Sequence, residues 1–163
     1  MSEETKLEER TSMEYKLSSN IDYEHVIVLI DAEILNQYLI SYHEEDELSY
    51  IKSQCKDEPK SSWISEGDIM NVFSVPIIRI NDENDIVIVD GRHRVYWMMS
   101  KNMLEIPVAI SHFTKKALDE RGLFLKMVDI LNMPCKVIPK PRTAVSSINM
   151  NAIFKKFIKR PFK

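Results

Sequence analysis

The residues best suited to chemistry form one short segment, Asp90-Gly-Arg-His-Arg94. It follows Ile86 to Val89, which is typical of a short buried strand, and it precedes Val95 to Met99, which continues as an apolar helix. The N–H groups at the start of such a helix have no partner within the helix, and the helix dipole is positive there. Two arginines add positive charge and paired hydrogen-bond donors. The pattern predicts an anion site, and phosphate is the anion that fits it best.

Each residue of this segment has a predicted role and an alternative. Arg94 is the strongest candidate for a bidentate phosphate contact, and the alternative is an ion pair with Asp90. Gly91 supplies backbone donors, and Arg92 adds a second phosphate contact or points to solvent. His93 donates to phosphate or acts as a general acid or base, and the alternative is a structural hydrogen bond. Asp90 is the second catalytic candidate, and the alternative is a helix cap.

A dedicated metal site is not expected from these residues. One carboxylate does not hold a hard cation such as Mg²⁺, so Asp90 would need partners. The carboxylates near expected strand or helix ends are Asp31, Glu33, Glu66 and Asp68. Each of these alone is better explained as a cap or a surface charge. Mg²⁺ stays open as a cofactor, with these carboxylates as the candidate partners of Asp90.

The order of elements around this segment resembles the ParB/sulfiredoxin-like domain, which includes ParB-like nucleases. The similarity is carried by Pro76-Ile-Ile-Arg-Ile80, a polar turn, Ile86 to Val89, Asp90 to Arg94, a helix, and Ile106-Pro-Val-Ala-Ile110. The resemblance covers residues 75–110 closely and 26–133 more loosely. It implies an α/β fold with a small mixed sheet and flanking helices, in which the glycine turn and its trailing arginine bind the phosphates of a nucleotide, such as ATP, or of DNA. Arg92 stands where sulfiredoxin has its catalytic cysteine and where ParB partition proteins have a glutamate, so the sulfiredoxin reaction is not expected.

Two function classes stay open at this point. The first is a nucleotide- or nucleic-acid-processing enzyme, which would be a nuclease, an NTPase such as an ATPase, or a phosphotransferase. Asp90, Gly91, His93 and Arg94 match the family and favour this class. The second is a non-enzymatic plasmid- or phage-type regulator that binds DNA or a protein partner, and Arg92 favours it.

Composition adds bounds on size, location and partners. A chain of 163 residues that is 44% hydrophobic can bury one ordinary core. The two cysteines have no metal-type spacing, and the N-terminus does not resemble a signal peptide, so a cytoplasmic location is the default.

Residues 1–50 carry thirteen acids against three basic residues, whereas residues 135–163 carry eight basic residues and no acid. The candidate contacts of this basic segment are Lys155, Lys156, Lys159 and Arg160. Their partner would be nucleic acid, a membrane surface, another protein or the acidic half of the chain itself.

The periodicity of apolar residues predicts three regions. Residues 1–19 are expected to be a flexible acidic leader, 20–133 the domain, and 134–163 a basic, proline-containing extension. Strands are expected at 26–30, 75–80, 86–89 and 106–110, and helices at 32–41, 44–55, 65–73, 114–131 and, in the extension, 147–159. Tyr96 and Trp97 are expected in the core, with base stacking as the alternative. Asn102 is expected to end the helix that contains them.

Overall fold

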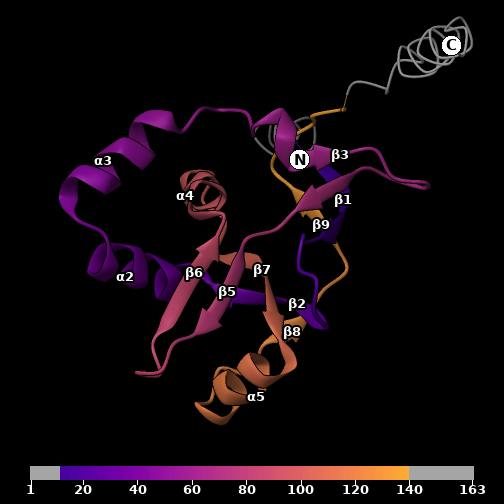
Figure 1. The fold of residues 1–163 in the computed structure, drawn as a ribbon. Coiled ribbons are helices and arrows are strands. Elements are labelled where there is room, and N and C mark those ends of the chain that lie inside the picture. The colour runs from indigo at the N-terminus through magenta and orange to yellow at the C-terminus, as the bar shows by residue number, and fades with distance from the viewer. Residues whose placement is uncertain (1–11, 140–163) are drawn as a thin grey trace, which may run out of the picture.

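The structure is a computed structural model that describes residues 12–139, and it is a mixed α/β fold (Figure 1). Its nine strands are β1 (Met13–Ser18), β2 (His25–Asp31), β3 (Ile64–Ser65), β4 (Val72–Ser74), β5 (Ile77–Ile80), β6 (Ile86–Asp90), β7 (Glu105–Ser111), β8 (Lys126–Met127) and β9 (Ile130–Met133). Its helices are α2 (Ala32–Tyr42), α3 (Glu45–Gln54), α4 (Arg92–Ser100), α5 (His112–Glu120) and the 3₁₀ turn η1 (Ser61–Trp63). Within the described range these strands form two mixed sheets rather than the single sheet expected from the sequence.

The larger sheet has five strands in the order β6-β5-β7-β2-β8. β2 and β7 pair antiparallel along their whole length, from His25 opposite Ser111 to Asp31 opposite Glu105. β5 and β6 form the expected hairpin, and β5 also pairs parallel with β7. The four strands predicted in this region are therefore confirmed as strands. The prediction that Ile86 to Val89 is buried is wrong, because β6 is an edge strand, it is only partly buried, and Val89 is 53% exposed.

The smaller sheet has four strands in the order β3-β4-β1-β9. β1 lies inside it, parallel to β4 and antiparallel to β9. Tyr15 and Leu17 alternate with exposed residues along β1, so that one face of the strand is buried in the core. The chain passes from this sheet to the larger one at Val75 and Pro76, where Val75 N–H donates to the Ser18 carbonyl and Ala109 N–H donates to the Pro76 carbonyl.

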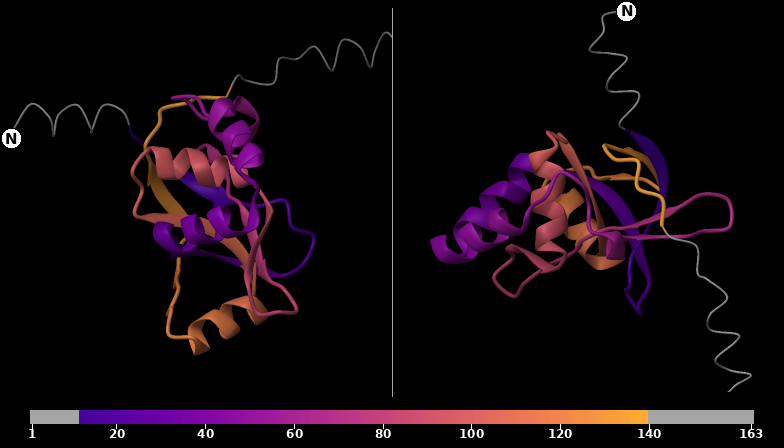
Figure 2. Two further views of the ribbon diagram at one scale, coloured as in Figure 1. Left: turned by 90° about the vertical axis from the view of Figure 1, so that its left-hand side faces the viewer. Right: turned by 90° about the horizontal axis from the view of Figure 1, so that it is seen from above.

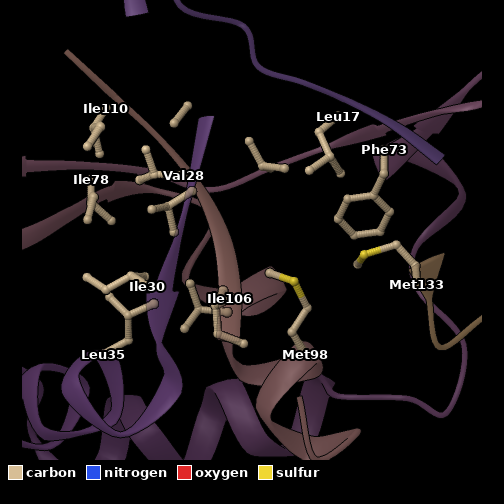
Figure 3. Packing of buried hydrophobic residues seen from close by; sticks show 14 of the residues in the cluster. Leu17, Val28, Ile30, Leu35, Phe73, Ile78, Met98, Ile106, Ile110 and Met133 are labelled. Carbon is tan, nitrogen blue, oxygen red and sulfur yellow. The ribbon is translucent and has the colours of Figure 1, made fainter. Parts of the chain in front are cut away.

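One hydrophobic cluster includes residues of both sheets (Figure 3). Met98 of α4 lies between Ile106 of the larger sheet and Phe73 of the smaller one. The ring of Phe73 stacks on Trp97, with centroids 6.1 Å apart. Trp97 is 1% exposed, which confirms its place in the core. α4 therefore contributes side chains to the contact between the two sheets.

The remaining helices lie around this core. α3 packs on α4, α2 packs on β2, and α5 packs on β7. Figures 1 and 2 show α3 and α5 at opposite ends of the molecule. Asp31 caps α2 as expected, since its carboxylate accepts hydrogen bonds from the N–H groups of Glu33 and Ile34. Asn102 ends α4 as expected, with a left-handed backbone at φ 59°.

Two predicted helices are wrong or too long. Residues 65–73 contain the end of β3, a loop and the start of β4 rather than a helix, because Val72 and Phe73 pair with β1 and β3. The helix expected at 114–131 ends at Glu120. Gly122 adopts φ 89°, and its N–H donates to the Asp119 carbonyl, which is a common way to end a helix. The chain beyond it forms β8 and β9 instead.

Both predicted limits of the domain need correction. Residues 13–18, assigned to the leader, form a central strand of the smaller sheet. At the other end, Cys135 is buried and its thiol donates to the Tyr15 hydroxyl, which itself donates to the Val137 carbonyl at 2.8 Å. The folded unit therefore includes residues on both sides of the predicted 20–133 range. The rest of the leader, and residues 140–163 with their predicted helix, lie outside the described residues.

No helix in the described part of the chain is long and apolar enough to cross a membrane.

Candidate anion-binding site at the start of α4

The site begins with the glycine turn between β6 and α4. Gly91 adopts φ 90°, a left-handed conformation, and its carbonyl accepts the first helical hydrogen bond, from Val95 N–H at 2.9 Å. A Cβ atom at this position would lie 2.8 Å from Nε of Arg94 and 2.9 Å from Cα of Pro76. Glycine is therefore required here both for its backbone and for its lack of a side chain. It also leaves the first turn of α4 without a capping side chain.

The guanidinium of Arg94 is buried against the junction of the two sheets, and the residue is only 7% exposed. Its Nη1 donates to the carbonyl and the hydroxyl of Ser74, at 3.0 and 2.8 Å, and to the Val75 carbonyl at 3.1 Å. Its Nη2 forms an ion pair with Asp90 at 2.5 Å. The ion pair that the sequence offered as the alternative is therefore present. Arg94 ties the first turn of α4 to the chain segment that joins the sheets.

Asp90 serves this ion pair and does not cap the helix. The residue at the cap position of α4 is Gly91, and no side chain there accepts a hydrogen bond from the helix. The Asp90 side chain is itself 61% exposed. The expectation that Asp90 caps α4 is thus wrong, because the turn directs its carboxylate toward Nη2 of Arg94.

Arg92 and His93 are more accessible than Arg94. Arg92 is exposed, and His93 is half-buried, with its ring edge-to-face against Tyr50 of α3 at a centroid distance of 6.2 Å. Burial lowers the pKa of His93 below its ordinary value, and the positive charges of Lys60 and Arg92 lower this pKa further. The imidazole is therefore mostly neutral at pH 7. Lys60 of the loop before η1 and Arg92 and His93 of the first turn of α4 therefore bring three groups that can carry positive charge close together.

His93 also lines a cavity of about 390 Å³ between the end of α3, residues 56–63 and α4. The side of the cavity near residues 56–60 is charged, whereas Trp63 and Trp97 line it with indole rings. Trp97 donates its Nε1–H to the Asp57 carbonyl at 3.2 Å, and Lys101 lies 3.8 Å from the Asp57 carboxylate. These contacts hold the segment that carries Lys60 against α4.

The sequence analysis missed Lys60 and Trp63 as members of this site. Residues 56–62 have no apolar period and contain a proline, so they indicate only a charged loop. What places them beside His93 is the contact between Trp97 and the loop backbone, which is a tertiary interaction between residues 40 positions apart. The sequence shows the basic residues Arg92 and Arg94 directly, but it does not show that Lys60 lies near them in the folded chain.

The described residues do not fit a metal site of their own. No three His, Cys, Asp or Glu side chains in residues 12–139 are arranged to hold a metal ion. Of the carboxylates considered as partners of Asp90, Asp31 caps α2. A role for Mg²⁺ would therefore depend on ligands that a bound phosphate supplies.

The predicted contacts Lys155, Lys156, Lys159 and Arg160 lie outside the described residues. Comparisons with protein-family models, curated proteins and solved structures gave no match for this chain. The resemblance to the ParB/sulfiredoxin-like domain thus stays a prediction that depends on the segment from Val75 to Ile110.

Proposed function

We propose that this protein binds the phosphate group of a nucleotide or nucleic acid at the start of α4, in the manner of a ParB/sulfiredoxin-like domain. One observation carries the proposal: Lys60 lines the same cavity as His93, and Arg92 directly precedes His93 in the chain, so that two cations from different segments lie near one imidazole. Like charges are costly to gather, so a cluster of this kind is favoured when an anion completes it. The uncapped N–H groups in the first turn of α4 add donors of the same sign.

Arg94 holds the glycine turn in place in this proposal, because all four of its hydrogen-bonding and ionic contacts are to the protein itself. Its Nη1 already donates to three protein oxygens, and Asp90 accepts from Nη2. A phosphate that took over these donors would leave Ser74 and Val75 without partners. We therefore assign direct contact with phosphate to Arg92, His93 and Lys60, and assign the shape of the turn to Arg94 and Gly91.

A second candidate function is phosphoryl chemistry at the same place. The observation that favours it is the lowered pKa of His93, which leaves a neutral imidazole that can accept a proton at neutral pH. In this scheme the cations bind the phosphate and His93 removes a proton from the attacking water or hydroxyl. Nuclease, NTPase and phosphotransferase reactions all contain such a step. The non-enzymatic alternative, a regulator that binds DNA or a protein, uses the same cations without this step.

Binding is tested with thermal shifts and calorimetry on matched variants. Pyrophosphate, ATP, CTP and a short DNA duplex are titrated into the full chain and into Lys60→Ala, Arg92→Ala and Lys116→Ala. A ligand that binds the folded state raises the melting temperature. We expect Lys60→Ala and Arg92→Ala each to weaken binding by roughly 1–2 kcal/mol, the size of a contact to a charged group.

Lys116→Ala is the control, because Lys116 is an exposed lysine on α5, at the end of the molecule away from α3 (Figure 1). The proposal fails if no phosphate compound raises the melting temperature, or if all three variants respond as the wild type does.

A further inference from the structure

We propose that the cavity beside His93 holds the base of an unpaired nucleotide, so that the ligand is a nucleoside phosphate and not phosphate alone. This inference rests on the proposed function, since it places the phosphate at His93, Lys60 and Arg92. It adds a second subsite, formed by residues that lie outside the Asp90-to-Arg94 segment.

The size of the cavity is the first argument. Its volume of about 390 Å³ falls within the range of sites for small organic ligands. A water molecule in the liquid takes up roughly 30 Å³, so a phosphate group with one or two waters would leave most of this space unfilled. The cavity is thus large enough for a ring system attached to the phosphate.

The walls of the cavity are the second argument. Trp97 is fixed by its stacking on Phe73 and by the hydrogen bond from its Nε1 to Asp57. Trp63 packs edge-to-face on Trp97, with centroids 6.2 Å apart, but is only half-buried. A half-buried indole that lines a cavity and is supported by a rigid second indole is suited to contact a planar ring.

The distribution of charge is the third argument. Lys56 and Lys60 are exposed and belong to the lining, and Arg92 acts on His93 from the adjacent turn. Among the described residues of the lining, Glu58 is the single acid. A site lined by both indole rings and cations matches a ligand that joins a flat ring to an anion. A base that is paired within a duplex cannot enter, so the nucleotide must be unpaired.

The test compares ligands that differ only in the base. The four ribonucleoside monophosphates and ribose 5-phosphate carry the same phosphate and sugar. The chain has two tryptophans and both line this cavity, so intrinsic fluorescence reports on it directly. We expect at least one monophosphate to change the tryptophan emission and to bind roughly tenfold or more tightly than ribose 5-phosphate, since stacking on an aromatic side chain has that effect.

Variants of Trp63 locate the effect. In Trp63→Leu the preferred monophosphate should bind only as well as ribose 5-phosphate, measured by calorimetry, while Trp63→Phe should retain part of the advantage. Circular dichroism checks that both variants fold. The wild-type comparison alone still decides the question if Trp63→Leu does not fold.

The outcomes separate the two proposals. If every monophosphate binds no more tightly than ribose 5-phosphate and Lys60→Ala weakens both equally, the base subsite is wrong and the phosphate site stands. If neither compound binds but pyrophosphate does, the base subsite is likewise wrong and the phosphate site stands; if pyrophosphate does not bind either, the phosphate site itself is wrong. A single-stranded hexanucleotide that competes with the monophosphate, when its duplex does not, would identify unpaired nucleic acid as the source, whereas no competition would identify the free nucleotide.

Discussion

Arg92 and Arg94 are two positions apart in the sequence, yet they lie in opposite environments. Arg92 is exposed beside His93, whereas Arg94 is buried and donates to Ser74, Val75 and Asp90. A buried arginine whose donors are all directed at the protein stabilises the fold mainly by leaving no acceptor unpaired. The two residues should therefore respond to substitution in different ways.

Replacing Arg94 by alanine should lower the free energy of unfolding by about 2–4 kcal/mol, because the Ser74 and Val75 carbonyls lose their partner and a cavity is left. Asp90 contributes little to this loss, since its side chain is largely exposed. Arg92→Ala is the matched control and should change the stability by less than about 0.5 kcal/mol. Urea denaturation followed by circular dichroism measures both. Equal stability of the two variants would show that the contacts of Arg94 do not hold the turn.

At the scale of elements, the two sheets differ in how visible they are in the sequence. The larger sheet is built from long apolar runs such as Val26 to Ile30 and Ile106 to Ile110, which predict strands by composition alone. β3 and β8 have two residues each, and β4 has three. Such short strands show no period, and they exist because a neighbouring strand satisfies their backbone groups. β1 was missed because its alternation of buried and exposed residues spans only six positions and lies within an acidic N-terminal segment that otherwise has no apolar period.

The place of β1 in the core gives a direct test of this correction. Leu17 is 4% exposed and belongs to the cluster shown in Figure 3. Leu17→Ala should lower the free energy of unfolding by roughly 2–5 kcal/mol, the cost of removing a buried leucine. Lys16→Ala, one position earlier on the exposed face, should have little effect. If both changes were neutral in denaturant titrations, residues 13–18 would be a leader after all.

The candidate site, like the fold, could be predicted from the sequence only in part. The strand, the glycine and the basic first turn of α4 follow from local sequence, and these features indicated a place for an anion. The roles of Arg94 and Lys60 do not follow from it. Arg94 reaches back to Ser74, and Lys60 is held near His93 through the contact of Trp97 with Asp57. Both depend on segments that meet only in the folded chain.

At the scale of the whole molecule, the site lies where three parts of the fold meet. α4 contacts both sheets, through β7 of the larger sheet and Phe73 of the smaller one. Arg94 ties the first turn of α4 to the segment that joins the sheets, and the end of α3 with residues 55–63 lines the cavity beside it. A ligand bound there would contact several parts of the chain at once. Its binding should therefore stabilise the folded state as a unit rather than a single loop.

The most direct measurement is the pKa of His93, followed by NMR through its imidazole signals. The chain has four histidines, and the missing signal in His93→Gln assigns the one of interest. Without ligand, its pKa should lie below the ordinary value and should rise in Lys60→Ala and in Arg92→Ala, because each variant removes a repelling positive charge. Saturating pyrophosphate should raise the pKa of His93, since a nearby anion favours the protonated ring. A pKa of His93 that stays the same with pyrophosphate bound would contradict a phosphate site at the start of α4.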